Sequence, residues 1–153
     1  IFSRKNLKKF VEYLIQLHEN HSNSKFIWIM HPSTQSKLLK YNLIDRLKNK
    51  IEVCGLIEHV KFISMLQNSL LFITDSLSAE FESFVLRKKT VIWRNSFVNR
   101  YDLDSFLYIT KSYTLDSSIS ATSSLINSDI NEKLSVVNKP SIEFYEIIKK
   151  IGY

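Results

Sequence analysis

The sequence predicts an α/β domain with a doubly wound parallel sheet that carries helices on both faces. Short apolar runs rich in β-branched and aromatic residues, typical of buried strands, alternate with longer stretches whose apolar residues recur every three or four positions, typical of amphipathic helices. Strands joined through such helices are expected to be parallel, because each helix carries the chain back to the edge where the previous strand began. We find no linker and no internal repeat, so we expect a single domain over residues 1–153.

The first half of the chain is expected to contain three helices and two strands. They follow in the order helix 7–17, strand 25–30, a helix that begins near Pro32, strand 51–55 and helix 57–68. Asn6 is the candidate N-cap of the first helix, because its side chain can accept a hydrogen bond from a first-turn N–H. The inward face of the second helix is expected to include Leu38 and Leu39.

The second half is expected to continue the alternation of strands and helices. The elements are strand 70–74, helix 77–86, strand 90–93, strand 106–110 and a closing helix 141–151. Leu77, Phe81 and Phe84 form the expected buried stripe of helix 77–86. The serine-rich segment 112–124 shows no clear periodicity, and the stretch 112–139 is the expected mobile part of the chain.

The charge and cysteine content exclude several classes of protein. The net charge is +6, but the basic residues are scattered and are not interleaved with aromatics, so we expect no nucleic-acid partner. No apolar run reaches the roughly 20 residues that span a bilayer. Cys54 is the only cysteine, which excludes an internal disulfide and favours a cytoplasmic location. The four histidines lack metal-ligand spacing and the usual nucleotide-binding glycine motifs are absent, so we expect no metal and no cofactor.

Polar residues follow three of the expected strands. His31 follows the first strand, Asp75 and Ser76 follow strand 70–74, and Arg94 follows strand 90–93. In doubly wound sheets, ligands bind beyond the carboxyl ends of the strands, where helix N-termini point N–H groups outward. These residues, distant in sequence, are therefore expected to share one edge of the sheet.

Residues of these types can recognise a phosphate and a sugar diol. Ser76 or Ser78 can cap the helix and donate to a phosphate, and Arg94 can balance the phosphate charge. Glu82 lies four residues after Ser78 on the same helical face, where it can accept hydrogen bonds from a ribose. Purely structural roles remain open for each: the serines as ordinary helix caps, Glu82 as a partner of the helix dipole, His31 as a turn residue and Arg94 as a surface residue.

The chain from about residue 25 to residue 104 resembles the C-terminal domain of the UDP-N-acetylglucosamine 2-epimerases, hydrolysing and non-hydrolysing, of the GT-B superfamily. The most specific part is "TDS" at residues 74–76, followed by an acid-rich helix and a strand that ends in Arg94. The resemblance implies a Rossmann-like fold and suggests that this chain corresponds to the C-terminal lobe of a two-lobed protein.

The resemblance also implies roles for individual residues. Ser76 would contact the diphosphate and Glu82 would hold the ribose hydroxyls. Arg94 matches the arginine that ends the following strand of the family, and Arg100 approximately matches a further arginine. His31 matches the family's His–Pro region.

The sequence departs from the family pattern at several of these positions. Leu77 and Ser78 replace the two glycines that follow the serine, and a leucine side chain would occupy space used by the diphosphate. Glu80 replaces a glutamine and so adds a negative charge beside the expected phosphate, and Phe81 replaces the first glutamate of a pair. Ser3 stands where the family has a catalytic histidine.

The function implied by the resemblance is a lobe that binds UDP or a UDP-sugar, in an epimerase-like or glycosyltransferase-like protein of surface polysaccharide synthesis. The family carries acidic catalytic residues on an N-terminal lobe. This chain lacks that lobe, so the chain alone is expected to be inactive. A homodimer is also a possible assembly. The alternative is a non-catalytic GT-B-like domain with a degenerate phosphate loop, acting as a scaffold or partner-binding module. A receiver-like or flavodoxin-like domain is a weaker alternative, because the acidic clusters and phosphate loops of those proteins are missing.

Overall fold

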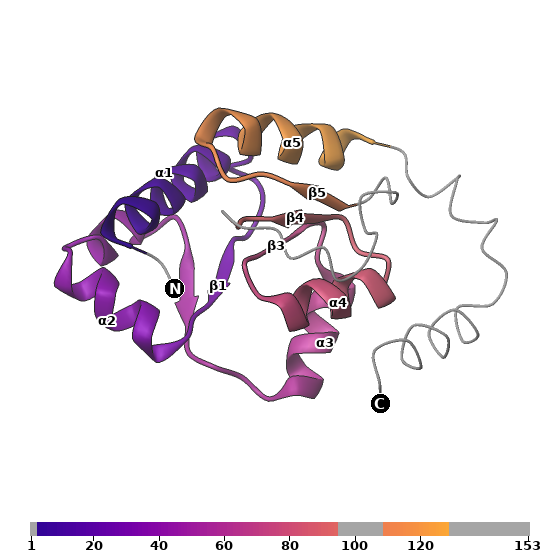
Figure 1. The fold of residues 1–153 in the computed structure, drawn as a ribbon, viewed down its shortest axis with the longest axis horizontal. Coiled ribbons are helices and arrows are strands. Elements are labelled where there is room, and N and C mark those ends of the chain that lie inside the picture. The colour runs from indigo at the N-terminus through magenta and orange to yellow at the C-terminus, as the bar shows by residue number, and fades with distance from the viewer. Residues whose placement is uncertain (1–2, 95–108, 129–153) are drawn as a thin grey trace, which may run out of the picture. The chain divides into compact units, whose positions relative to one another are not determined.

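The computed structural model describes residues 3–94 and 109–128 (Figure 1). These residues belong to two compact units, the first made of residues 3–65 and 113–120, and the second of residues 66–94, 109–112 and 121–128. The predicted closing helix 141–151 and the candidate site residue Arg100 lie outside the described residues.

The first unit contains a two-stranded parallel sheet and the helices that adjoin it in sequence. Its elements are α1 (Arg4–Asn20), β1 (Ile27–Ile29), α2 (Pro32–Lys40), the short 3-10 helix η1 (Ile44–Leu47) and β2 (Glu52–Cys54), and α3 (His59–Asn68) begins in it. The parallel register pairs Ile27 with Glu52 and Ile29 with Cys54. Both α1 and α2 pack against η1.

Helix α1 supplies much of the core of the first unit. Its buried residues recur at helical spacing and are Leu7, Phe10, Val11, Tyr13, Leu14, Ile15 and Leu17. The ring of Phe10 meets that of Trp28 edge-on, with 5.1 Å between the ring centroids. The predicted cap was wrong: Ser3 is the N-cap, and its Oγ accepts from the backbone N–H of Asn6 at 3.2 Å. Asn6 is a donor here because the helix begins at Arg4, three residues earlier than expected.

Two leucines that were expected to face inward are exposed. Leu38 is fully buried on α2, but Leu39 is 55% exposed, because consecutive residues on a helix point about 100° apart. Leu77 is 37% exposed at the first position of its helix. Helical side chains lean toward the N-terminus, so a residue at the first position has no preceding turn to cover.

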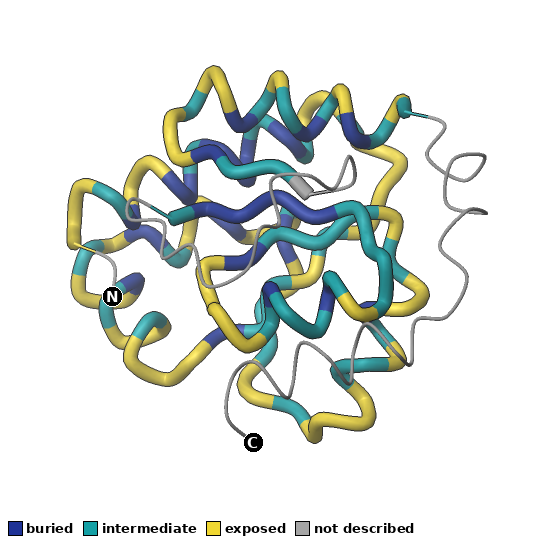
Figure 2. The backbone as a smooth tube through the Cα atoms, turned by 45° about the vertical axis from the view of Figure 1, so that its right-hand side comes forward, coloured by how far each residue is buried: buried dark blue, intermediate teal, exposed yellow. Residues whose placement is uncertain are grey.

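The second unit contains a three-stranded parallel sheet. Its elements are β3 (Phe72–Thr74), α4 (Leu77–Val85), β4 (Thr90–Ile92) and β5 (Ile109–Lys111), with the strands in the order β3-β4-β5. The central strand β4 is buried at all three positions, and α4 packs against β3 and β4. In Figure 2 the buried tube includes β4, and buried residues recur between exposed ones along α1 and α5.

Helix α5 (Leu115–Asn127) occupies the serine-rich segment that showed no clear pattern. Its buried positions include Ser118, Thr122 and Leu125, which lie four and three residues apart. Two of these three side chains are small and polar. The buried positions therefore have helical spacing, but they cannot be recognised in the sequence as a pattern of apolar residues. Ser118 Oγ donates to the carbonyl of Thr114 at 2.6 Å, which satisfies its polar group where it is buried.

The predicted α/β fold with parallel strands and helices is confirmed. Every strand pair that the structure describes is parallel, and helices follow β1, β2, β3 and β5. Across residues 3–94 and 109–128, no helix is both long and apolar enough to cross a bilayer.

Candidate functional site

The carboxyl ends of β3 and β4 form one edge of the sheet in the second unit. Thr74 and Ile92, the last residues of these strands, are register partners, and Trp93 N donates to Thr74 O at 2.8 Å. The chain therefore leaves both strands at the same edge, where Ser76 follows β3 and Arg94 follows β4. We refer to this region, made of residues 74–80 with Arg94, as the β3–β4 edge.

Ser76 forms the N-cap of α4 at this edge. Its Oγ accepts from Ala79 N at 3.5 Å and lies 3.1 Å from Ser78 Oγ, while its own N–H donates to Thr74 Oγ1 at 3.0 Å. Both serines are exposed. The first N–H groups of a helix have no intrahelical acceptor and carry the positive end of its dipole, so this terminus can attract an anion. Ser76 therefore performs the capping role, and both hydroxyls remain accessible to solvent.

Arg94 is largely enclosed and paired, in contrast to a surface residue. Its Nη2 forms an ion pair with Glu80 Oε2, and the two side chains are only 14% and 5% exposed. Its Nη1 donates to the backbone carbonyl of Asp75 at 3.4 Å. Its Nε is buried and has no hydrogen-bond partner among the described residues. The charge of Arg94 is thus balanced within the chain, and the arginine links the end of β4 to the turn after β3.

Glu80 is the residue at this edge whose role the sequence interpretation missed. We expected an additional negative charge beside a phosphate, whereas Glu80 is buried and neutralised by Arg94. One signal in the sequence could have revealed the pair: an acid one turn into a helix after one strand, and an arginine directly after the next strand. Parallel strands that are neighbours bring such positions together.

Leu77 and Ser78 form the first turn of α4 without any special backbone conformation. Among the described non-glycine residues, positive φ angles occur only at Asn42, Asn49 and Arg87. The β3–α4 turn therefore does not use the left-handed backbone that would call for glycine at these two positions. The leucine is accommodated at the first position of the helix, where it is 37% exposed.

The two other described candidate residues are Glu82 and His31. Glu82 is half-buried on α4, one turn after Ser78, and is two positions from Glu80, so these two carboxylates project in different directions. His31 belongs to the first unit, where it is exposed at the carboxyl end of β1 and caps α2. Its Nδ1 accepts from Ser33 N at 3.2 Å and lies 2.9 Å from Ser33 Oγ. The structure brings Ser76, Ser78 and Arg94 to one edge.

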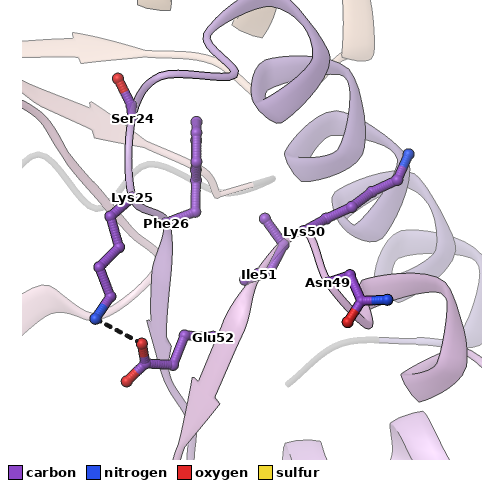
Figure 3. A pocket seen from close by; sticks show the side chains of 7 residues that line it. All are labelled: Ser24, Lys25, Phe26, Asn49, Lys50, Ile51 and Glu52. Carbon is purple, nitrogen blue, oxygen red and sulfur yellow. Dashed lines mark ion pairs between the residues drawn. The ribbon is translucent and has the colours of Figure 1, made fainter.

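A separate hollow of about 290 Å³ lies in the first unit, beside the amino ends of β1 and β2 (Figure 3). Its lining residues are Ser24, Lys25, Phe26, Asn49, Lys50, Ile51 and Glu52. Both lysines are engaged in ion pairs, Lys25 with Glu52 at 2.7 Å and Lys50 with Glu19 at 2.6 Å. The cations of this hollow are thus compensated, and it lies at the amino ends of β1 and β2, whereas ligands were expected at the carboxyl ends of strands. In the part of the chain that the structure describes, no group of histidine, cysteine and acidic residues could hold a metal ion.

Comparison with known proteins relates this chain to one family. The sequence model of the UDP-N-acetylglucosamine 2-epimerase family matches residues 2–101. Two curated relatives are the UDP-N-acetylglucosamine 2-epimerase of Methanocaldococcus jannaschii and a homologue of that enzyme from Methanococcus maripaludis. The first is 27% identical over 96 residues and the second 27% identical over 95 residues, each covering 61% of this chain.

A solved structure of the Methanocaldococcus jannaschii enzyme, in complex with UDP-GlcNAc and UDP, superimposes on this chain with a TM-score of 0.77. The match covers 83% of this chain and 35% of that one at 22% identity, so it shows the shared fold. The matched regions cover about a quarter of the curated relatives, 26% and 25% of their lengths.

Proposed function

Because this chain belongs to the UDP-N-acetylglucosamine 2-epimerase family, we propose that it is a nucleotide-sugar-binding lobe whose ligand is UDP or a UDP-sugar. The parent protein is then epimerase-like or glycosyltransferase-like and acts in surface polysaccharide synthesis. In such a two-lobed protein this lobe holds the UDP group, and the N-terminal lobe supplies the catalytic acids. The lobe therefore contributes binding and orientation rather than proton transfer.

The observation that carries this proposal is the meeting of Arg94 with the Asp75–Ser76 turn at the β3–β4 edge. This contact lies next to the N-terminus of α4, whose dipole attracts anions, and the guanidinium keeps further N–H donors beside its pair with Glu80. The exposed hydroxyls of Ser76 and Ser78 are the donors for a diphosphate. Glu82, one turn along α4, is the acceptor for the ribose hydroxyls. His31 and Arg100 are further ligand residues in this proposal.

Isothermal titration of the full-length protein with UDP tests the proposal. We expect binding in the millimolar range or tighter. The Ser76→Ala variant should weaken it about three- to tenfold, because one hydrogen bond to the diphosphate is lost. Ser36→Ala is the matched control, since this exposed serine of α2 donates to the Pro32 carbonyl within its own helix. Heat equal to that of dilution at millimolar UDP, with folded protein, would reject the proposal.

The second candidate is a non-catalytic domain that acts as a scaffold or partner-binding module. Two observations favour it: Leu77 occupies a position where the family has glycine, and the Arg94 charge is already neutralised by Glu80. The leucine reduces the space for a diphosphate, and the pairing with Glu80 reduces the net positive charge that a diphosphate would meet. The same titration separates the candidates, because a scaffold of this kind gives no heat with UDP.

A further inference from the structure

The most unusual charged group at the β3–β4 edge is the guanidinium of Arg94. It has five N–H donors, of which one meets Glu80 Oε2 and one meets the Asp75 carbonyl, while the buried Nε donates to no described residue. Buried donors are nearly always satisfied in proteins. Since only two of its five N–H donors have a partner that the structure describes, the guanidinium can donate further hydrogen bonds, although its charge is balanced.

The carboxylate of Glu80 occupies this guanidinium from inside the chain. It lies one helical turn into α4, with a side chain that is only 5% exposed, so solvent screens its charge little. A ligand phosphate at the α4 N-terminus would need the same cation and would also approach the same carboxylate. Opposite charges already paired inside the protein offer little net attraction to a further anion, and a like charge close by opposes it.

We infer that Glu80 determines the anion affinity of the β3–β4 edge by competing with the ligand diphosphate for Arg94. This inference rests on the proposed UDP-binding function and specifies how the site is tuned. Glu80 is a positioning residue in this sense: it acts through Arg94 and does not contact the ligand. The site then binds multiply charged anions with lower affinity than the same arginine and helix terminus would without the Glu80 carboxylate.

The Glu80→Gln variant of the full-length protein tests this inference. Glutamine has nearly the same shape and can still accept a hydrogen bond from Arg94, but it carries no charge. We expect the dissociation constant for UDP, measured by isothermal titration, to fall about tenfold or more. The melting temperature is expected to fall at the same time, because a buried ion pair is lost. A merely structural role for Glu80 would instead weaken both stability and UDP binding.

Three further variants define the route of the effect. The double variant Glu80→Gln with Arg94→Gln should lose the gain, because the freed cation is absent. Glu12→Gln is the matched control, because Glu12 makes the same kind of pair with Arg46 Nη2 in the first unit, and its UDP affinity should equal that of the wild type. Glu80→Asp, which withdraws the carboxylate by one methylene, should give a smaller gain and serves if the glutamine variant does not fold.

The possible outcomes separate this inference from the function on which it rests. A wild type that binds UDP together with a Glu80→Gln variant that binds no tighter would overturn the inference and leave the function standing. A gain that persists in the double variant would also overturn it, since Arg94 would then not be involved. If neither the wild type nor Glu80→Gln binds millimolar UDP while both are folded, the proposed function fails and the inference fails with it.

Discussion

The pair of Glu80 and Arg94 shows that a buried carboxylate in this protein requires a nearby cation. A carboxylate that is 5% exposed loses most of its hydration, and only a nearby cation makes its burial tolerable. The pair also links two segments of chain, because Arg94 holds the Asp75 carbonyl as well. Its removal would therefore disturb both the charge balance and the turn that leads into α4.

The Arg94→Met variant is predicted to lower the free energy of unfolding by about 3–5 kcal/mol, because it leaves the Glu80 carboxylate buried without a cation. Urea denaturation followed by circular dichroism measures this loss. Arg46→Met is the control: Arg46 and its partner Glu12 are 37% and 35% exposed, so the loss there should be about 1 kcal/mol or less. Equal losses in the two variants would contradict the special cost of burial at Glu80.

At the scale of elements, α1 is joined to the chain before β2 by two ion pairs as well as by its apolar face. Glu12 pairs with Arg46 of η1, and Glu19 pairs with Lys50 just before β2. The hydrogen bond from Lys50 and its positive charge lower the pKa of Glu19 below the ordinary value of 4.5. A carboxyl whose pKa is lower in the folded state stabilises the fold above its unfolded pKa, and this contribution is lost as the pH falls through the folded pKa.

The Lys50→Gln variant is predicted to raise the pKa of Glu19 toward 4.5, which a carboxyl NMR titration of the folded protein would detect. The wild type should then lose more stability than the variant as the pH is lowered below about 4.5. In the control variant Lys25→Gln, which breaks the pair with Glu52, the pKa of Glu19 should not change. An unchanged Glu19 pKa in Lys50→Gln would show that the contact does not persist in solution.

At the scale of the whole molecule, the match to the curated relatives involves about a quarter of their length. In the two-lobed protein proposed above, the catalytic acids belong to the lobe outside this match. The following remain predictions: the single domain over residues 1–153, its place as the C-terminal lobe, the homodimer, the cytoplasmic location and the lack of a nucleic-acid partner.

The 153-residue chain alone is predicted not to interconvert UDP-N-acetylglucosamine and its C2 epimer. Proton NMR of the reaction mixture measures the amounts of the two epimers. The UDP-N-acetylglucosamine 2-epimerase of Methanocaldococcus jannaschii is the positive control. Accumulation of the epimer with this chain alone, at a rate proportional to its concentration, would refute the assignment of the catalytic acids to another lobe.

Much of the architecture could be predicted because local patterns carry it. The apolar runs at β3 and β4 and the three-and-four spacing in α1 depend only on near neighbours in sequence. Helix α5 escaped prediction because its buried face includes Ser118 and Thr122, so the local pattern did not distinguish a buried polar face from a solvated one.

The sequence by itself determined the order of the helices and strands up to β5, apart from the short helix η1, the parallel direction of the strands, and the position of Ser76 and Arg94 just beyond strand ends. These features follow from periodicity and from the direction of the chain, which are local properties. Only the tertiary structure decided that Arg94 is enclosed and neutralised by Glu80, and that Leu77 is exposed. The reason is that charge pairing and burial depend on which segments become neighbours in space, and Arg94 lies 14 positions after Glu80 along the chain.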